Sequence, residues 1–171
     1  GYVPQKAVMF SGSVLSNITF GKNRHGKPSK ERVKAAIRVS QAEEFVSKLD
    51  DKEKAHIAQG GTNVSGGQKQ RLSIARTIAR DPEIYIFDDS FSALDYKTDS
   101  TFCSELKKYT KDATVMIVAQ RIGTILNADK IVVLDNGKCV GIGTHKELMK
   151  KCKVYKEIAL SQVSKEELEN V

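Results

Sequence analysis

The chain has 171 residues, of which 40% are hydrophobic and 29% are charged, and its formal net charge is +7. This composition is typical of a soluble globular domain, and no run approaches the roughly 18 uninterrupted apolar residues that span a bilayer. Basic and aromatic residues do not alternate along the chain, so the positive charge does not indicate a nucleic-acid partner.

The first third of the chain predicts helices and loops more than strands. Residues 1–5 read as the end of a strand that enters a loop, and we expect further sequence to precede them. A short helix is expected over residues 13–18. Ser29 is a suitable N-cap for a helix that extends to about residue 49, because apolar side chains recur there at helical spacing. Residues 50–63 are polar and contain glycines, which predicts a loop.

Beyond residue 65, helices alternate with short apolar runs. A helix is expected over residues 66–80, and Asp81 and Pro82 end it. Three apolar runs then predict buried strands, at residues 84–87, 115–118 and 131–134. Such alternation predicts an α/β fold with a mostly parallel sheet.

The connections in this second part carry clear local signals. Asp95 can cap the helix that follows the first of these strands. Asn136 and Gly137 form the strongest short hairpin signal in the chain. Two further helices are expected, at residues 145–151 and 154–160, before a charged tail.

Ser65, Gly66, Gly67 and Gln68 stand at the start of the helix expected over residues 66–80. The free N–H groups of a first helical turn carry about half a positive charge. Two residues without side chains let a phosphate approach those groups closely. The run therefore predicts a phosphate-binding helix N-terminus.

The run from Asn63 to Arg71, with these four residues inside it, resembles the signature motif of ATP-binding cassette (ABC) ATPases. In that family the motif holds the γ-phosphate of an ATP molecule that is seated on a different subunit. The resemblance covers nearly all residues from 1 to about 159, with several motifs in the family's order. It implies ATP and Mg²⁺ as cofactors and a second nucleotide-binding domain as a partner.

Asp88 directly follows an apolar run, where the resemblance implies a Walker B aspartate that holds Mg²⁺ directly or through water. An acidic pair after a strand can also be a plain polar turn. The position favours the metal role, because Ser92, Ala93, Leu94 and Asp95 come next and resemble the family's D-loop. The D-loop aspartate couples the two nucleotide sites of a dimer, and this role is compatible with helix capping by Asp95.

Two glutamines and a glycine pair extend the resemblance. Gln5 matches the Q-loop glutamine, which touches the metal or water and links the ATPase to transmembrane domains. Gln120 stands where the family has its switch histidine. The glycines at residues 60–61 fall where exporters place a segment that contacts the coupling helices. The resemblance thus implies catalytic roles for Gln5, Asp89 and Gln120, and metal-binding roles for Asp88 and Gln5.

One departure from the family pattern is that no Walker A strand and phosphate loop precede Gln5. Residues 21–27 imitate that motif in their glycine and lysine spacing. The next residue must be Ser or Thr, whose hydroxyl binds Mg²⁺, and here it is Pro28. We therefore reject this segment as a phosphate loop, and we expect the chain alone to bind ATP poorly and to hydrolyse none.

Two further departures concern the catalytic residues. Asp89 stands where the family usually has a glutamate that polarises the attacking water, and it is shorter by one carbon bond, about 1.5 Å. A misplacement of about 1 Å can cost on the order of 100-fold in rate. Gln120 cannot exchange protons as an imidazole does. Together with the intact signature, these changes resemble the degenerate-site subunit of heterodimeric multidrug exporters.

The expected fold is a partial P-loop NTPase of the ABC ATPase type, with a helical subdomain and the later part of a mostly parallel core sheet. We expect the Q-loop and a strand end in residues 1–10, the helical subdomain in 11–81, the later ATPase core in 82–160, and a charged tail in 161–171. The family's phosphate-loop strand lies inside the sheet, so its absence should expose strand edges and apolar surface and favour self-association or chain exchange between copies.

The resemblance implies an ATP-binding subunit of an exporter at the cytoplasmic face of the cell membrane. It would couple ATP binding and hydrolysis to the export of drugs or lipids. Its partners would be transmembrane domains and a second nucleotide-binding domain in a heterodimer, with no nucleic acid. Two alternatives stay open: a soluble ABC ATPase of DNA or translation, whose usual long insertions are not seen, and a non-catalytic regulatory cassette that only dimerises.

Overall fold

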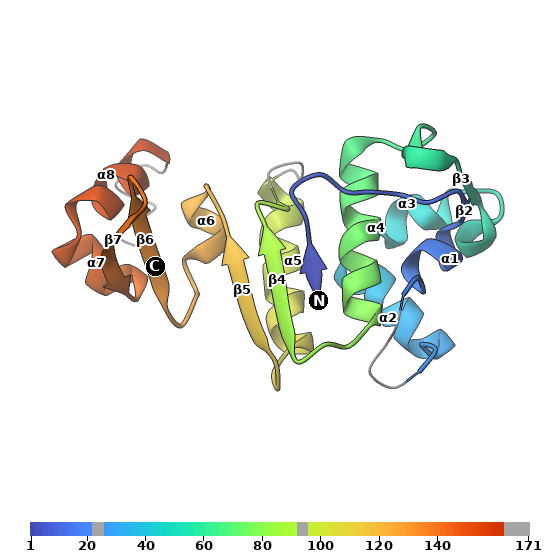
Figure 1. Ribbon diagram of the computed structural model, residues 1–171, viewed down its shortest axis with the longest axis horizontal. Coiled ribbons are helices and arrows are strands. Elements are labelled where there is room, and N and C mark those ends of the chain that lie inside the picture. Colours follow the sequence, from blue (N-terminus) through green and yellow to red (C-terminus); the bar gives the residue numbers. More distant parts are fainter. Residues whose placement is uncertain (22–25, 92–95, 163–171) are drawn as a thin grey trace. The chain divides into compact units, whose positions relative to one another are not determined.

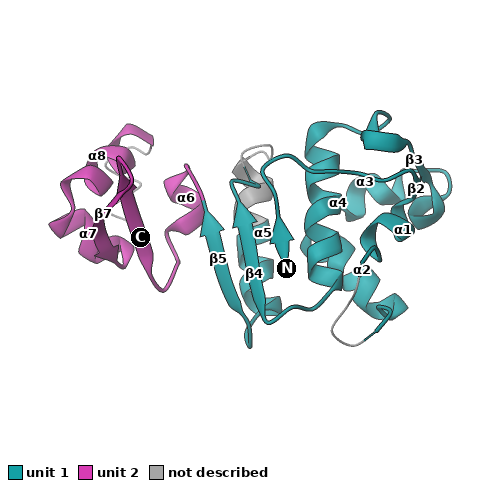
Figure 2. Ribbon diagram, in the orientation of Figure 1, with its two compact units in different colours: residues 1–118 teal, residues 119–171 magenta. Residues whose placement is uncertain are grey.

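The computed structural model describes residues 1–21, 26–91 and 96–162, with the backbone alone at 96–101. The chain divides into two compact units, Gly1–Val118 and Ala119–Val171, which Figure 2 shows in different colours. The boundaries expected from the sequence, at residues 10, 81 and 160, remain a prediction. Within the described ranges, the helices are too short or too polar to cross a membrane.

Unit 1 contains a parallel sheet of three strands, in the order β1-β4-β5. The strands are β1 (Tyr2–Val3), β4 (Ile84–Asp88) and β5 (Thr114–Val118). Figure 1 shows α5 (Tyr96–Tyr109) running along the sheet beside β4. The parallel α/β arrangement predicted from the sequence is confirmed for these strands.

The two faces of this sheet differ in exposure. Val3, Tyr85 and Phe87 are at most 1% exposed and point into the core of unit 1. On the other face, Met116 is 56% exposed and Val118 is 49% exposed. The expectation of fully buried strands is therefore wrong for one face, because the described residues cover only the other.

The helical part of unit 1 contains α1 (Val14–Ile18), α2 (Lys30–Val39), α3 (Glu43–Ser47) and α4 (Gly66–Ala79). Ser29 caps α2 as predicted, since its hydroxyl accepts a hydrogen bond from the Arg32 N–H at 3.2 Å.

The helix predicted from Ser29 to about residue 49 is in fact two helices, α2 and α3. The chain turns at Gln41, whose φ is +57°. On an unbroken helix, Ala36 and Phe45 would lie on opposite faces, because each residue rotates the helix by about 100°. The break allows both side chains to be buried.

The predicted loop at residues 50–63 contains short elements that the sequence did not indicate. They are η1 (Lys52–Lys54), β3 (His56–Ile57) and η2 (Gln59–Gly61). β3 pairs antiparallel with β2 (Gly12–Ser13) and buries Ile57.

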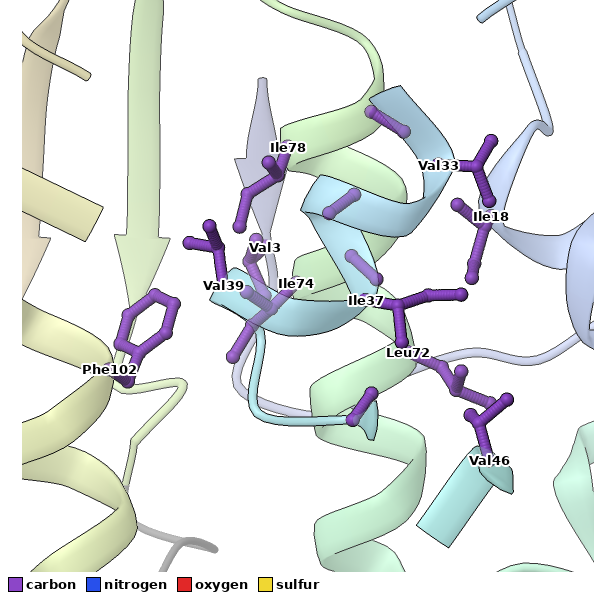
Figure 3. Close-up of a cluster of buried hydrophobic side chains, with 14 of the residues drawn as sticks. Val3, Ile18, Val33, Ile37, Val39, Val46, Leu72, Ile74, Ile78 and Phe102 are labelled. Carbon is purple, nitrogen blue, oxygen red and sulfur yellow. The ribbon is translucent and has the colours of Figure 1, made fainter. Parts of the chain in front are cut away.

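One hydrophobic core joins the sheet to the helices of unit 1. Figure 3 shows side chains from β1, α1, α2, α3, α4 and α5 that gather in this core, where they are all buried: Val3, Ile18, Val33, Ile37, Val39, Val46, Leu72, Ile74, Ile78 and Phe102. Because α4 packs against both β1 and α2, the core fixes the position of the segment that begins at Gly66.

Unit 2 contains α6 (Ile122–Ile125), β6 (Ile131–Asp135), β7 (Lys138–Gly143), α7 (His145–Lys151) and α8 (Lys153–Gln162). The predicted hairpin is present, and Asn136 and Gly137 both have positive φ, at +48° and +75°. Positive φ at both central residues is what a type I′ turn requires.

The alternation of helices and strands taken alone would place residues 131–134 in the parallel sheet, but the hairpin signal joins them to residues 138–142, and the structure confirms the hairpin. β6 pairs antiparallel with β7 in a separate two-stranded sheet. The tight turn at Asn136 and Gly137 brings β7 against β6 as its immediate neighbour. The pairing thus follows from a local signal rather than from the alternation of strands and helices.

Candidate functional site

The N-terminus of α4 is closed by a reciprocal pair of hydrogen bonds. The Ser65 hydroxyl accepts from the Gln68 N–H at 3.3 Å, and the Gln68 Oε1 accepts from the Ser65 N–H at 2.9 Å. This arrangement is a capping box, in which two backbone donors of the helix start are satisfied by side chains. The box fixes where the helix begins, so that Gly66 and Gly67 form its first turn.

The two glycines leave the start of α4 open. The N–H groups of Gly66 and Gly67 have no partner inside the helix, as is usual for a first turn. A Cβ added to Gly66 would meet no atom within 4 Å. The helix start can therefore accept an anion at its backbone donors, with the favourable end of the helix dipole behind them.

A second cluster of polar side chains lies at the carboxyl end of β4. The Tyr2 hydroxyl donates to Asp88 Oδ2 at 2.7 Å. The Gln5 side-chain amide donates to Asp89 Oδ2 at 3.0 Å. The parallel pairing of β1 with β4 places Val3 opposite Phe87, so residues far apart in sequence meet at this edge. The fold brings together Gln5, Asp88 and Asp89, three of the residues that the sequence singled out.

The backbone at Asp89 is unusual. Its φ is +44°, and its N–H donates to the Val118 carbonyl at 2.9 Å. Aspartate is among the few side chains that adopt the left-handed region readily. The next hydroxyl, on Ser90, is buried without a hydrogen-bond partner among the described residues. The strand thus ends in a tight and polar segment, where Asp89 suits the backbone.

The oxygen donors at the end of β4 fit a magnesium ion. Mg²⁺ binds through one or two carboxylates, several waters and the phosphate oxygens of a substrate. The described residues contain no cluster of three acidic, histidine or cysteine side chains that could hold a metal by themselves. Asp88 could hold the ion directly or through water, and the Gln5 amide oxygen could contribute, because the Gln5 contact with Asp89 uses only the amide nitrogen.

Tyr2 was not identified from the sequence as a site residue. Its hydrogen bond to Asp88, ahead of burial, raises the pKa of the Tyr2 phenol, so the hydroxyl stays protonated and donates. The available signal was the alternation in β1, where buried Val3 implies that Tyr2 lies on the other face of the sheet, together with Asp88.

A further contact that sequence reasoning missed joins α4 to the segment after β1. Gln70, which is 2% exposed, donates to the Pro4 carbonyl at 3.0 Å. Arg76 donates to the Val8 carbonyl at 3.0 Å and lies over the Phe10 ring. These bonds tie the helix of the signature run to the residues on either side of Gln5.

The structure does not test the roles predicted for several other residues. Ser92, Ala93, Leu94 and Asp95 lie outside the described residues, as do residues 22–25 of the rejected phosphate-loop imitation. Gln120 belongs to unit 2, where its carbonyl accepts from Gln162 Nε2 at 2.7 Å. The roles of all these residues stay predictions.

Known proteins are similar in sequence to almost the whole chain. An uncharacterized ABC transporter ATP-binding protein of Mycobacterium tuberculosis is 45% identical over 162 residues, which are 95% of this chain and 28% of that protein. A putative export ATP-binding/permease protein of Rickettsia conorii is 39% identical over 163 residues, with the same shares of each chain. This chain thus spans little more than a quarter of the length of these relatives.

A solved structure shares the fold. It is that of a bacterial Atm1-family ABC exporter with ATP bound, with a TM-score of 0.87 and 32% sequence identity. The match covers 94% of this chain and 28% of that chain. The expected partial ABC ATPase fold is therefore confirmed. The family model for ABC transporters matches residues 1–92, more than half of the 171 residues, and the chain belongs to the ABC transporter family.

Proposed function

We propose that this chain is part of the ATP-binding subunit of an exporter, which couples ATP binding and hydrolysis to transport across a membrane. The observation that carries the proposal is the meeting of Gln5, Asp88 and Asp89 at the carboxyl end of β4. Figure 1 shows α4 beginning at the same end of unit 1 toward which β1 and β4 point. The names of relatives as export proteins support the direction of transport.

The residues at the end of β4 have separate roles in this proposal. When bound, Mg²⁺ neutralises phosphate charge and ATP supplies the γ-phosphoryl group. Asp88 holds the metal ion directly or through a water molecule. Gln5 turns its amide oxygen to the metal or to water, while its amide nitrogen restrains Asp89.

The start of α4 serves an ATP molecule that is held by a second nucleotide-binding domain. Gly66 and Gly67 donate their N–H groups to its phosphate oxygens. Ser65 and Gln68 hold the first helical turn in place through the capping box. The chain therefore completes a site whose metal-binding half belongs to its partner in a dimer.

The chain's own half-site hydrolyses ATP slowly or not at all, and the dimer is a heterodimer. Asp89 carries a carboxylate about 1.5 Å closer to the backbone than a glutamate would. It also accepts the Gln5 hydrogen bond, which restrains the carboxylate. Gln120 cannot replace a histidine in proton exchange.

The helical part of unit 1 passes changes at the nucleotide site to transmembrane domains at the cytoplasmic face of the membrane. Gln70 and Arg76 hold α4 to the residues around Gln5, so the Q-loop and the signature helix shift together. The exported compounds are drugs or lipids, on the basis of the resemblance to multidrug exporters.

The main test is the steady-state ATPase activity of the full-length transporter assembled with its partner. Changing the partner's catalytic glutamate to glutamine should lower the rate by about 100-fold or more, as expected for loss of a general base. The Asp89→Asn variant of this chain should retain most of the activity. Loss of activity in Asp89→Asn alone would contradict the asymmetric assignment, and equal rates in all variants would favour a regulatory cassette.

The 171-residue chain alone should bind ATP poorly and should self-associate through the uncovered face of the β1-β4-β5 sheet. Met116 and Val118 are about half exposed there, and parallel sheets are normally covered on both faces. Sedimentation at several concentrations should show dimers or larger species, and Met116→Glu should shift them toward monomer. A monomer at all concentrations would contradict this part of the proposal.

A further inference from the structure

The Tyr2 side chain makes a specific contact with the residue that the proposed function assigns to the metal ion. The distance from Tyr2 Oη to Asp88 Oδ2 is 2.7 Å, which is typical of a short hydrogen bond to an ionised carboxylate. We propose that Tyr2 is a positioning residue, which fixes the Asp88 carboxylate for Mg²⁺; this inference rests on the proposed function.

The strand register explains why this contact needs a tyrosine. Tyr2 lies opposite Ile86 in the parallel β1-β4 pair, and Asp88 is two residues farther along β4 on the same face. Diagonal neighbours of this kind are about 7–8 Å apart, which only aromatic and long side chains bridge. The phenol spans this diagonal and delivers its hydroxyl to the carboxylate.

The chemistry of the donor suits a metal site. A lysine in the same place would bring a positive charge next to Asp88 and oppose the binding of a cation. The phenol donates a hydrogen bond without adding a positive charge, so it does not oppose the binding of a cation. No other hydrogen bond to the Asp88 side chain is found within the described part of the chain, and its second oxygen is left for the ion or its water.

The position of Tyr2 also links Asp88 to Gln5. Tyr2 is in β1, and Gln5 follows two residues after that strand. The two side chains hold Asp88 and Asp89 respectively. The start of the chain therefore restrains both carboxylates at the end of β4, one with a phenol and one with an amide.

The test is Mn²⁺ binding to the full-length transporter with its partner in the presence of ATP, followed by EPR, because free Mn²⁺ gives a sharp signal that is lost on binding. Tyr2→Phe keeps the ring and removes only the hydroxyl. It should weaken one class of Mn²⁺ site by about 10-fold, the lower end of what the loss of a ligand's supporting hydrogen bond costs. ATP binding in EDTA and the thermal unfolding temperature should not change.

Two further variants make the result decisive. Tyr109→Phe removes a phenol hydroxyl elsewhere in unit 1 and should leave Mn²⁺ binding as in the unmodified protein. Asp88→Asn should abolish the same class of site that Tyr2→Phe weakens. If the unmodified protein binds no Mn²⁺ with ATP, or if Asp88→Asn has no effect, the proposed function itself fails at this site.

The inference about Tyr2 fails separately from the proposed function. If Asp88→Asn removes a Mn²⁺ site while Tyr2→Phe binds Mn²⁺ as tightly as the unmodified protein, or more tightly, Tyr2 does not position Asp88. If Tyr2→Phe weakens ATP binding equally in EDTA, its role is general packing, and the inference is also overturned.

Discussion

The two polar clusters of unit 1 are built in opposite ways. At the start of α4, Ser65 and Gln68 hydrogen-bond each other within a single helical turn. At the end of β4, Asp88 and Asp89 are held by Tyr2 and Gln5, which lie more than eighty residues earlier in the chain. The first cluster depends on local sequence, and the second depends on the sheet.

This difference predicts how each cluster responds to amino-acid substitutions. A local capping box can form whenever its helix forms, whereas the acidic cluster exists only while β1 is paired with β4. Gln70 and Arg76 join α4 to the residues on either side of Gln5, through the Pro4 and Val8 carbonyls. Variants can therefore disturb the clusters one at a time.

The largest effect is expected from Phe87→Ala. Phe87 is fully buried and packs against Tyr85, Phe91 and Phe102. Truncation should lower the free energy of unfolding of unit 1 by about 3–5 kcal/mol. Native-state hydrogen exchange of the β4 amides would measure it.

The same strand offers a control for this variant. Ile84→Ala changes a side chain that is 51% exposed and should cost less than about 1 kcal/mol. Equal losses in the two variants would contradict the assignment of most of the stability of β4 to its core-facing side chains.

A smaller effect is expected from Gln70→Ala, which removes the link from α4 to the residue just before Gln5. The Pro4 carbonyl would lose its bond to a side chain that is 2% exposed, and such a loss costs about 1–3 kcal/mol. Hydrogen exchange around residues 5–10 should accelerate. Gln59→Ala, at an exposed position, is the matched control; if it had the same effect, Gln70 would not be the link.

Ser65→Ala should disturb the local cluster alone. Loss of an N-cap hydroxyl costs about 1 kcal/mol, and it should fray the first turn of α4 without changing the exchange of β4 amides. Thr144→Ala removes the equivalent capping box of α7 and should have a similar effect confined to unit 2. Spread of the Ser65→Ala effect to β4 would break the distinction between the clusters.

The last prediction concerns pH and the start of α7. His145 is buried with its Nδ1 2.8 Å from the Tyr155 hydroxyl, and desolvation, with a smaller contribution from Lys146, lowers the pKa of His145. The unfolded chain therefore binds the proton more readily. The stability contributed by neutral His145 is complete above about pH 6.5 and is lost as the pH falls through the folded-state pKa, by at most about 1.4 kcal/mol per pH unit.

Hydrogen exchange of α7 and α8 amides between about pH 7.5 and pH 5.5, the range in which a histidine titrates, would measure this loss. His145→Gln should flatten the dependence. Tyr155→Phe should keep most of it, because burial is the main cause of the pKa shift. An unchanged profile in His145→Gln would assign the pH response to other groups.

The sequence alone determined the features that depend on neighbouring residues. The caps at Ser29 and Ser65, the end of α4 near Asp81, and the Asn136 and Gly137 turn were all predictable, because each depends on side chains within a few positions. The alternation of helices and apolar runs indicated a parallel α/β sheet, and family resemblance pointed to Gln5, Asp88 and Asp89.

Tertiary structure decided what depends on residues far apart in sequence. It divided the helix predicted after Ser29 at Gln41, because both resulting helices have to bury their apolar faces in one core. It also placed Tyr2 against Asp88, since register and reach across two strands cannot be read from either strand alone.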